Sequence, residues 1–263
     1  MQVPPAAIVV SQEGRVRRIT MARPEKRNAL SMEMCRALLD AFAAAEADPA
    51  TGCILLDAQG KVFCSGMDLD EALEQGPKGE LEIHEELFTV GQRLTKPIVA
   101  AVQGPALAGG IGLLCNAHVV VAAMGTNFGI TELRIGMFPF VIFRAVAAAI
   151  GERRALEMSL TARVFQTDEA LRIGLIHQVA PEFELDDRAS ALAHTIAGHS
   201  AEVTRIGLDY VNRARFLAHD EAGALARRLR LDVFRHADYA EGVTAFKEKR
   251  RPAWPSQAGE PSA

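Results

Sequence analysis

The sequence predicts an α/β fold built from short buried strands and helices. The chain has 263 residues, of which 49% are apolar and 24% charged, so it can bury a large core. Short apolar segments without polar alternation are interleaved with segments of helical spacing, which is typical of parallel strands covered on both faces. Glycines recur at the joints of these segments, at 60–66, 104–112 and 125–136, and suggest repeated supersecondary units.

The N-terminal segments predict a hairpin followed by a helix. Residues 7–22 are largely apolar on both sides of Gly14, which lies in the turn-like sequence QEGRV. Between 34 and 45, apolar residues recur at steps of three and four. We expect this helix to begin after Ser31, whose hydroxyl can cap it, and to end before Pro49.

Three further strands are predicted along the chain. Apolar segments at 53–58, 98–102 and 118–123 are each followed by glycine-containing or polar turns. The second of them leads through a glycine-rich loop into an apolar helix that begins near Ile111.

The composition changes in the last third of the chain. From 185 to 249 the sequence is rich in Ala, Arg and Glu at helical spacing. A boundary near Ser200 therefore divides a core with the ligand site, residues 1–199, from a helical region, residues 200–263.

The composition also excludes several classes of protein. The 29 basic and 33 acidic residues give a net charge of −4, so we expect no nucleic-acid or membrane partner. No apolar stretch reaches the ~18 residues of a membrane span. The four cysteines form no CxxC pair and predict reduced thiols, and the histidines lack the spacing of metal ligands. We expect a cytoplasmic protein without a bound metal.

Two glycine-containing loops are the candidates for chemistry. Residues 60–69 and 104–110 each follow an apolar strand, and the second precedes a helix. Unpaired N–H groups at a helix start, approached through small residues, can form an oxyanion hole. The alternative is that the glycines only make tight turns. The dinucleotide fingerprint, the P-loop, HExxH and GxSxG are all absent from the sequence.

In their order, several motifs resemble the crotonase (enoyl-CoA hydratase/isomerase) superfamily over about residues 5–255. The motifs are RPEKRNAL at 23–30, FCSGMDL at 63–69, KPIVAAVQG at 96–104, FGITELRIG at 128–136, the segment 170–179, and AFKEKR at 245–250. The resemblance implies a spiral of repeated ββα units with a C-terminal helical region that forms homotrimers, which commonly pair into hexamers. It also implies an acyl-CoA thioester as the substrate, with coenzyme A part of that substrate and no separate cofactor.

The resemblance also assigns binding residues. Gly66, Met67 and Asp68 match the Gly-Ala-Asp loop of the family, and the backbone N–H groups of Met67 and Gly109 match its oxyanion hole. The positions that match the nucleotide end of CoA are Lys26, Arg27, Cys64 and Leu69. Phe246 and Lys249 match a pair that reaches the CoA of a neighbouring subunit, although Lys249 taken alone reads as a solvated helix end.

The catalytic positions depart from the family pattern. Hydratases of this family use two glutamates, and the first is replaced here by Gly112 while the second is Glu132. A single carboxylate beside an oxyanion hole can move a proton between two carbons, which favours double-bond isomerisation. The alternatives are a hydratase with atypical water activation and a non-catalytic acyl-CoA-binding protein. Glu132 itself has the alternative of a structural role at a strand end.

Aromatic residues replace the small ones expected near the acyl group. Phe138, Phe140 and Phe143 follow Gly136 and predict an apolar acyl pocket, in which desolvation would raise the pKa of Glu132. Core packing is the alternative for each of them.

Overall fold

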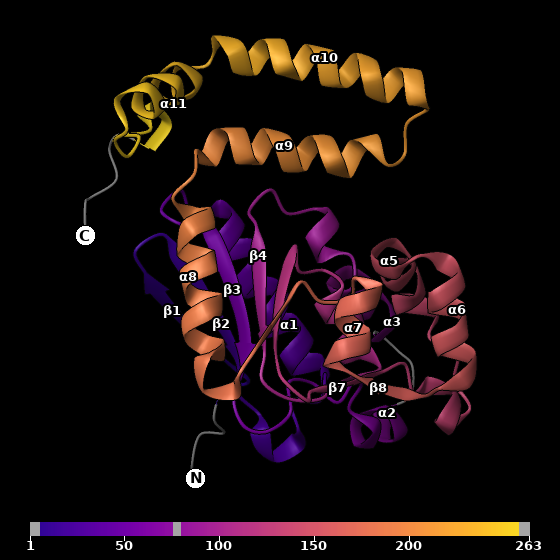
Figure 1. Cartoon of the computed structure of the whole chain (residues 1–263). Helices are drawn as coiled ribbons and strands as arrows, with labels where there is room; N and C mark the ends of the chain where they lie inside the picture. Colours follow the sequence, from indigo (N-terminus) through magenta and orange to yellow (C-terminus); the bar gives the residue numbers. More distant parts are fainter. Residues whose placement is uncertain (1–5, 76–79, 258–263) are drawn as a thin grey trace.

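A six-stranded sheet forms the centre of the molecule in a computed structural model, which describes residues 6–75 and 80–257 (Figure 1). Its strand order is β1-β2-β3-β4-β6-β9, with β1 antiparallel to β2 and all other pairs parallel. The strands are β1 (Ile8–Glu13), β2 (Val16–Met21), β3 (Cys53–Ala58), β4 (Ile98–Val102), β6 (Val119–Ala123) and β9 (Gln178–Ala180). A smaller sheet has the order β5-β7-β8, from β5 (Ala106–Leu107), β7 (Asn127–Gly129) and β8 (Val164–Gln166).

Helices cover both faces of the main sheet. Those of the core are α1 (Met32–Ala47), α2 (Leu69–Gln75), α3 (Glu80–Leu87), α4 (Gly109–Leu114), α5 (Phe140–Ile150), α6 (Glu152–Thr161), α7 (Thr167–Ile173) and α8 (Leu185–Ala197). Short 3₁₀ turns are η1 (Pro24–Lys26), η2 (Val90–Gln92), η3 (Glu132–Ile135) and η4 (Glu182–Glu184). The α/β prediction is confirmed.

Alternate residues of β3 face two different cores. Ile54 and Leu56 pack into the large cluster that includes α1, whereas Cys53 and Leu55 pack against α8. All five residues of β4 are buried. Strands covered on both faces have no solvent side to place polar residues on, which explains the apolar sequences of 53–56 in β3 and of all of β4.

The predicted hairpin and first helix are confirmed. Gly14 makes the turn between β1 and β2 with a φ of 53°, a value that glycine adopts without steric cost. Ser31 caps α1, because its hydroxyl oxygen accepts a hydrogen bond from the N–H of Met34 at 3.2 Å.

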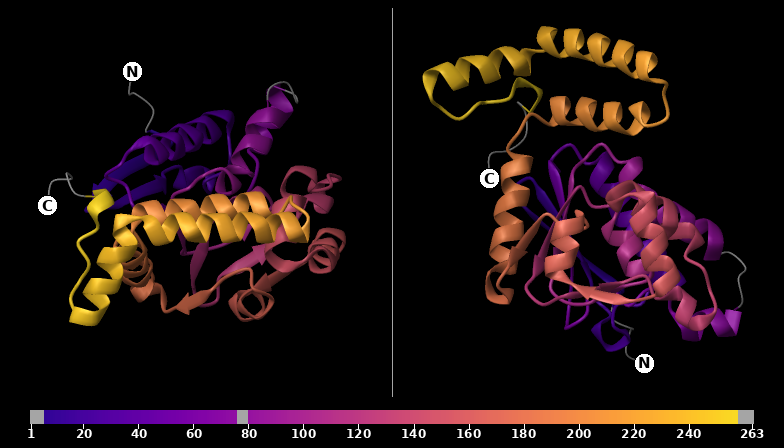
Figure 2. Two further views of the ribbon diagram at one scale, coloured as in Figure 1. Left: turned by 90° about the horizontal axis from the view of Figure 1, so that it is seen from above. Right: turned by 45° about the vertical axis from the view of Figure 1, so that its right-hand side comes forward.

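The last helices extend beyond the sheet as an arm (Figures 1 and 2). The arm consists of α9 (Ala201–Ala214), α10 (His219–Arg235), α11 (Ala237–Glu248) and the 3₁₀ turn η5 (Pro255–Gln257). Helices α9 and α10 lie side by side and antiparallel in both figures. Among the described residues, no helix combines the length and the apolar character needed to cross a bilayer.

Candidate active site

The loop that follows β3 is tied to two neighbouring segments. The N–H of Leu30 donates to the carbonyl of Gly66 at 2.8 Å, and the N–H of Asp68 donates to the carbonyl of Leu30 at 3.1 Å. On the other side, the N–H of Leu107 donates to the carbonyl of Cys64 at 3.0 Å. These bonds hold the loops 60–69 and 104–110 next to each other, as isolated β-bridges.

The two loops approach so closely that only glycine fits at position 66. Gly66 has a φ of 94°, and a Cβ there would lie 2.8 Å from the Cβ of Ala108 and 3.2 Å from the nitrogen of Gly109. Within the described part of the chain, the N–H groups of Met67 and Gly109 donate no hydrogen bond. Two free N–H groups on adjoining loops are what an oxyanion hole requires. Their binding of a thioester oxygen stays a prediction.

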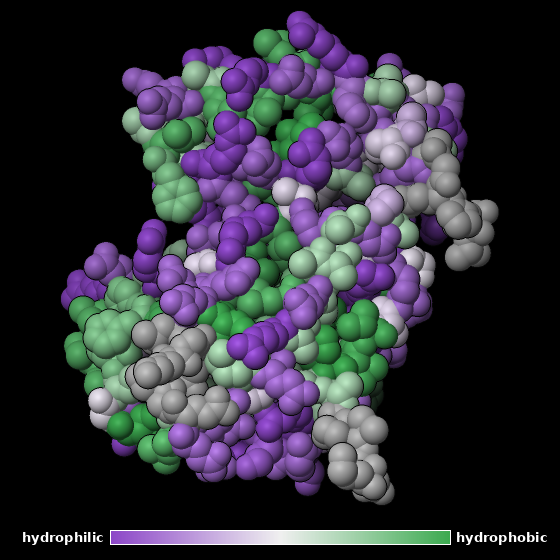
Figure 3. Space-filling view, turned by 180° about the vertical axis from the view of Figure 1, so that it is seen from behind, coloured by the Kyte–Doolittle hydropathy of each residue, from purple (hydrophilic) through white to green (hydrophobic). Residues whose placement is uncertain are grey.

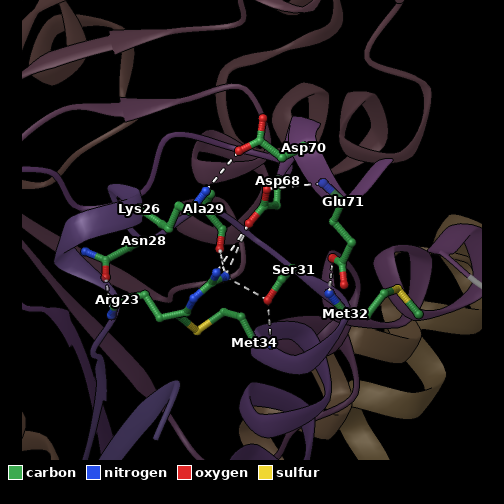
Figure 4. Close-up of polar contacts among 10 residues, drawn as sticks. All are labelled: Arg23, Lys26, Asn28, Ala29, Ser31, Met32, Met34, Asp68, Asp70 and Glu71. Atoms are coloured by element: carbon green, nitrogen blue, oxygen red, sulfur yellow. Dashed lines mark hydrogen bonds and ion pairs between the residues drawn. The ribbon is translucent and has the colours of Figure 1, made fainter. Parts of the chain in front are cut away.

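A polar network anchors the Met67 loop to the start of α1 (Figure 4). The guanidinium of Arg23 donates to the Asp68 carboxylate at 3.4 Å and to Ser31 Oγ at 2.8 Å. Glu71 Oε2 accepts from the N–H of Met32 at 2.7 Å. Asp68 is 7% exposed, so its carboxylate serves this network and does not face the apolar cavity described next.

A cavity of about 440 Å³ opens beside the two free N–H groups, and its lining is mainly apolar. Six residues predicted from the sequence line it: Met67, Leu69, Gly109, Glu132, Phe138 and Phe140. The structure thus brings together the two loops, the carboxylate and the aromatic segment around one space.

Glu132 is the acid that faces this cavity. It begins η3 directly after Thr131, its residue is 9% exposed, and its Oε2 is buried with no hydrogen-bond partner among the described residues. Burial raises the pKa of Glu132 to about 7, an effect that hydrogen bonds from the backbone of Thr131 and Glu132 oppose. A carboxyl group with this pKa can both accept and return a proton near neutral pH.

Gly112, which was predicted to contact substrate, packs against two apolar side chains. It is buried in α4, and a Cβ there would lie 2.3 Å from Cγ2 of Ile142 and 3.0 Å from Cδ1 of Phe88. It is not among the residues that line the cavity, and its contact with substrate stays a prediction. Ile142 and Phe88 occupy the space into which a side chain at 112 would extend.

The aromatic segment divides between cavity and core. The rings of Phe138 and Phe140 have centroids 5.1 Å apart and line the cavity, whereas Phe143 packs against the large core cluster. Phe140 is 77% exposed. Hydrophobic side chains gather on this part of the surface, over α5 and α6, at the left of Figure 3. Both interpretations of the phenylalanines therefore hold, each for different residues.

His84 lines the same cavity and was not predicted from the sequence. It lies on α3, is 7% exposed, and stacks on Phe88 with ring centroids 5.8 Å apart. Its Nε2 is buried without a hydrogen-bond partner in the described structure, and burial lowers the pKa of the imidazole. The available signal was helical spacing, because residues four apart share a helix face and Phe88 is apolar.

The residues predicted to bind the nucleotide end of CoA have different surroundings, and Leu69 is the one that lines the cavity. Lys26 and Arg27 are exposed, and Lys26 Nζ pairs with Asp70 at 2.9 Å. Cys64 is fully buried in the core, and its contact with the nucleotide end of CoA stays a prediction. The neighbouring strand Ala106–Leu107 covers it through the bridge described above.

Phe246 and Lys249 lie far from the cavity of their own chain. They are at the end of α11, on the side of the arm away from α5 (Figure 1). Phe246 is 85% exposed and borders a separate apolar hollow with Trp254. Contact with the ligand of a neighbouring subunit stays a prediction.

Comparisons with known proteins agree with this geometry. The family model described as enoyl-CoA hydratase/isomerase matches residues 11–257. The enoyl-CoA hydratase domain-containing protein 3, mitochondrial, of Danio rerio is 32% identical over 250 residues, which cover 94% of this chain and 86% of that protein. The enoyl-CoA hydratase EchA19 of Mycobacterium tuberculosis is 33% identical over 252 residues, which cover 93% of this chain and 94% of that protein. The crystal structure of an enoyl-CoA hydratase from Mycobacterium smegmatis superposes with a TM-score of 0.89 at 30% identity, covering 94% of this chain and 98% of that one.

Proposed function

The chain belongs to the enoyl-CoA hydratase/isomerase family and is an enzyme of acyl-CoA chemistry, and from this premise we propose that it isomerises the double bond of an enoyl-CoA. The observation that carries the proposal is the buried carboxylate of Glu132, which shares one cavity with the free N–H groups of Met67 and Gly109. The substrate is a thioester whose double bond lies between C3 and C4.

The proposed reaction needs one proton carrier. The thioester oxygen accepts hydrogen bonds from the N–H groups of Met67 and Gly109, and the ionised Glu132 takes a proton from C2. The electron pair of that C–H bond forms a dienolate, whose negative oxygen the two N–H groups stabilise. Glu132 then returns the proton to C4, which leaves the double bond between C2 and C3. No proton is gained or lost overall.

The packing at Gly112 favours isomerisation over hydration. Hydration requires a group that holds and deprotonates a water molecule opposite Glu132. Ile142 and Phe88 fill the space that a carboxylate on residue 112 would need. Hydration is the second candidate because two of the named relatives are called enoyl-CoA hydratases.

A spectroscopic assay with two substrates tests the proposal. We expect a 3-enoyl-CoA to be converted to the conjugated 2-enoyl-CoA faster than crotonyl-CoA loses its conjugated double bond to water. The reverse order of rates would indicate a hydratase. Binding of both thioesters without turnover of either would indicate a non-catalytic acyl-CoA-binding protein.

We also propose that the arm, α9 to α11, assembles the chain into a homotrimer or a hexamer. Large apolar residues of the arm are exposed, including Val211, Phe234 and Phe246. Their burial in a partner would remove this surface from water. We expect sedimentation to show a trimer or hexamer, and a stable monomer at micromolar concentration would contradict the assembly.

A further inference from the structure

His84 is a polar residue of the cavity that the proposed reaction does not use. Its Nε2 is buried and has no partner in the described structure, although the residue lines the same space as Glu132. The surrounding lining is dominated by apolar side chains, such as Phe88, Leu69 and Ala72. Buried polar atoms in proteins are normally hydrogen-bonded, and the described residues supply no such partner to Nε2.

The chemical groups on an acyl chain in the cavity would determine whether Nε2 of His84 has a hydrogen-bond partner. In the unliganded enzyme, Nε2 of His84 is buried without a hydrogen-bond partner among the described residues. A plain hydrocarbon chain in the cavity offers this nitrogen no partner either. A chain that carries an oxygen near the imidazole supplies the hydrogen bond. Binding sites that hydrogen-bond a substrate oxygen discriminate strongly against analogues that lack it.

Phe88 lies between the oxyanion loop and His84 in the packing of this region. Phe88 lies next to the oxyanion loop, since a Cβ on Gly109 would be 3.1 Å from Cζ of Phe88. The His84 ring is 5.8 Å from the Phe88 ring, one helical turn back along α3. Phe88 thus contacts the oxyanion loop, and His84 stacks on Phe88, so an acyl chain that extends past Phe88 would meet the imidazole.

We propose that His84 determines specificity for acyl groups that carry a hydroxyl or carbonyl oxygen on the chain, beyond the reacting carbons. The proposal rests on the thioester site described above. The imidazole, neutral at pH 7 because its pKa is lowered, can donate to or accept from such an uncharged oxygen. His84 is here a binding residue, and proton transfer remains with Glu132.

Calorimetry with saturated acyl-CoA thioesters tests the proposal without turnover. Chains of equal length are compared with and without one hydroxyl group, placed in turn at each carbon from C4 onward. We expect at least one hydroxylated chain to bind wild-type protein about tenfold to a hundredfold more tightly than the plain chain. Binding of the plain acyl-CoA tests the thioester site by itself. A failure of that site would therefore be distinguished from a failure of the proposed preference for a hydroxyl group.

Two substitutions at one position supply the matched comparison. His84→Phe keeps a ring to stack on Phe88 but removes the hydrogen bond, so it should abolish the preference for the hydroxylated chain. His84→Gln keeps a hydrogen-bonding group and should retain part of the preference. Equal binding of every pair by the wild type, or an unchanged preference in His84→Phe, would overturn the proposal. The wild-type and Gln results decide the matter if the Phe variant does not fold.

Discussion

Ile142 packs directly over the backbone of Gly112, although the two residues belong to different helices. A Cβ on Gly112 would lie 2.3 Å from Cγ2 and 2.9 Å from Cβ of Ile142, well inside van der Waals contact. The branched side chain of α5 therefore takes the space of a side chain on α4. The absence of a carboxylate at 112 and the presence of Ile142 are two parts of one packing arrangement.

This packing predicts that the single substitution Gly112→Glu destabilises the protein. The new side chain overlaps Ile142, so the free energy of unfolding should fall by ~1–3 kcal/mol or more. Urea denaturation measures this change. Adding Ile142→Ala makes room, and the double variant should show a higher ratio of hydration to isomerisation than Ile142→Ala alone. An unchanged ratio in a folded double variant would mean that a carboxylate at 112 is not what the enzyme lacks.

Glu132→Gln should lower kcat by about 10²–10⁴-fold, because it removes the only carboxylate that faces the cavity among the described residues. The shape of the side chain is kept, so affinity for a saturated acyl-CoA should change little. Steady-state kinetics and calorimetry measure the two effects. Retention of more than about half of the wild-type turnover would show that Glu132 is structural.

The raised pKa of Glu132 predicts a pH-dependent difference in stability between wild type and Glu132→Gln. The native state binds the proton more tightly than the unfolded state, so the stability that Glu132 contributes is lost as pH rises from about 4.5 to about 7. Between pH 4 and pH 8 the Gln variant should gain on the order of 3 kcal/mol relative to wild type, from a shift of 4.5 to about 7. Urea unfolding of both proteins at the two pH values measures the difference. A constant difference would contradict the raised pKa.

Gly109→Pro should abolish turnover, because proline has no N–H to donate to the thioester oxygen. Gly109→Ala is the matched control: it keeps the N–H and adds a Cβ that would lie 3.1 Å from Phe88 Cζ and 3.2 Å from Leu30 Cδ1. We expect the Ala variant to lose less activity than the Pro variant. Circular dichroism establishes that both are folded. Full activity in a folded Pro variant would exclude Gly109 as an oxyanion donor.

Lys249→Glu should weaken the binding of CoA thioesters if the lysine reaches the phosphates of a neighbour's ligand. The weakening should be smaller at high salt, where exposed charges are screened. Lys249→Gln, which only removes the charge, should have an intermediate effect. Calorimetry at two salt concentrations measures this, and equal affinity in all three proteins would place Lys249 outside the ligand site.

Local pattern in the sequence was enough to predict the elements that frame the site. The strands β3 and β4 were predicted with their observed bounds because strands buried on both faces are mainly apolar and lack polar alternation. The Ser31 cap and the Gly14 turn are likewise short-range effects of backbone hydrogen bonding and positive φ. The site residues Met67, Gly109 and Glu132 were identified through ordered motifs, and the fold places all three around one cavity.

Only the tertiary structure decided what surrounds each of these groups. Cys64 is sealed in the core by a strand some forty residues later in the chain, and Ile142 closes the space beside Gly112. His84 is buried and the pKa of Glu132 is raised because residues of α3, η3 and α5 pack around one cavity. Helix periodicity and capping depend on neighbours within a few residues, so sequence alone reveals them. Desolvation and steric exclusion depend on atoms brought close from distant segments, so they exist only in the folded chain.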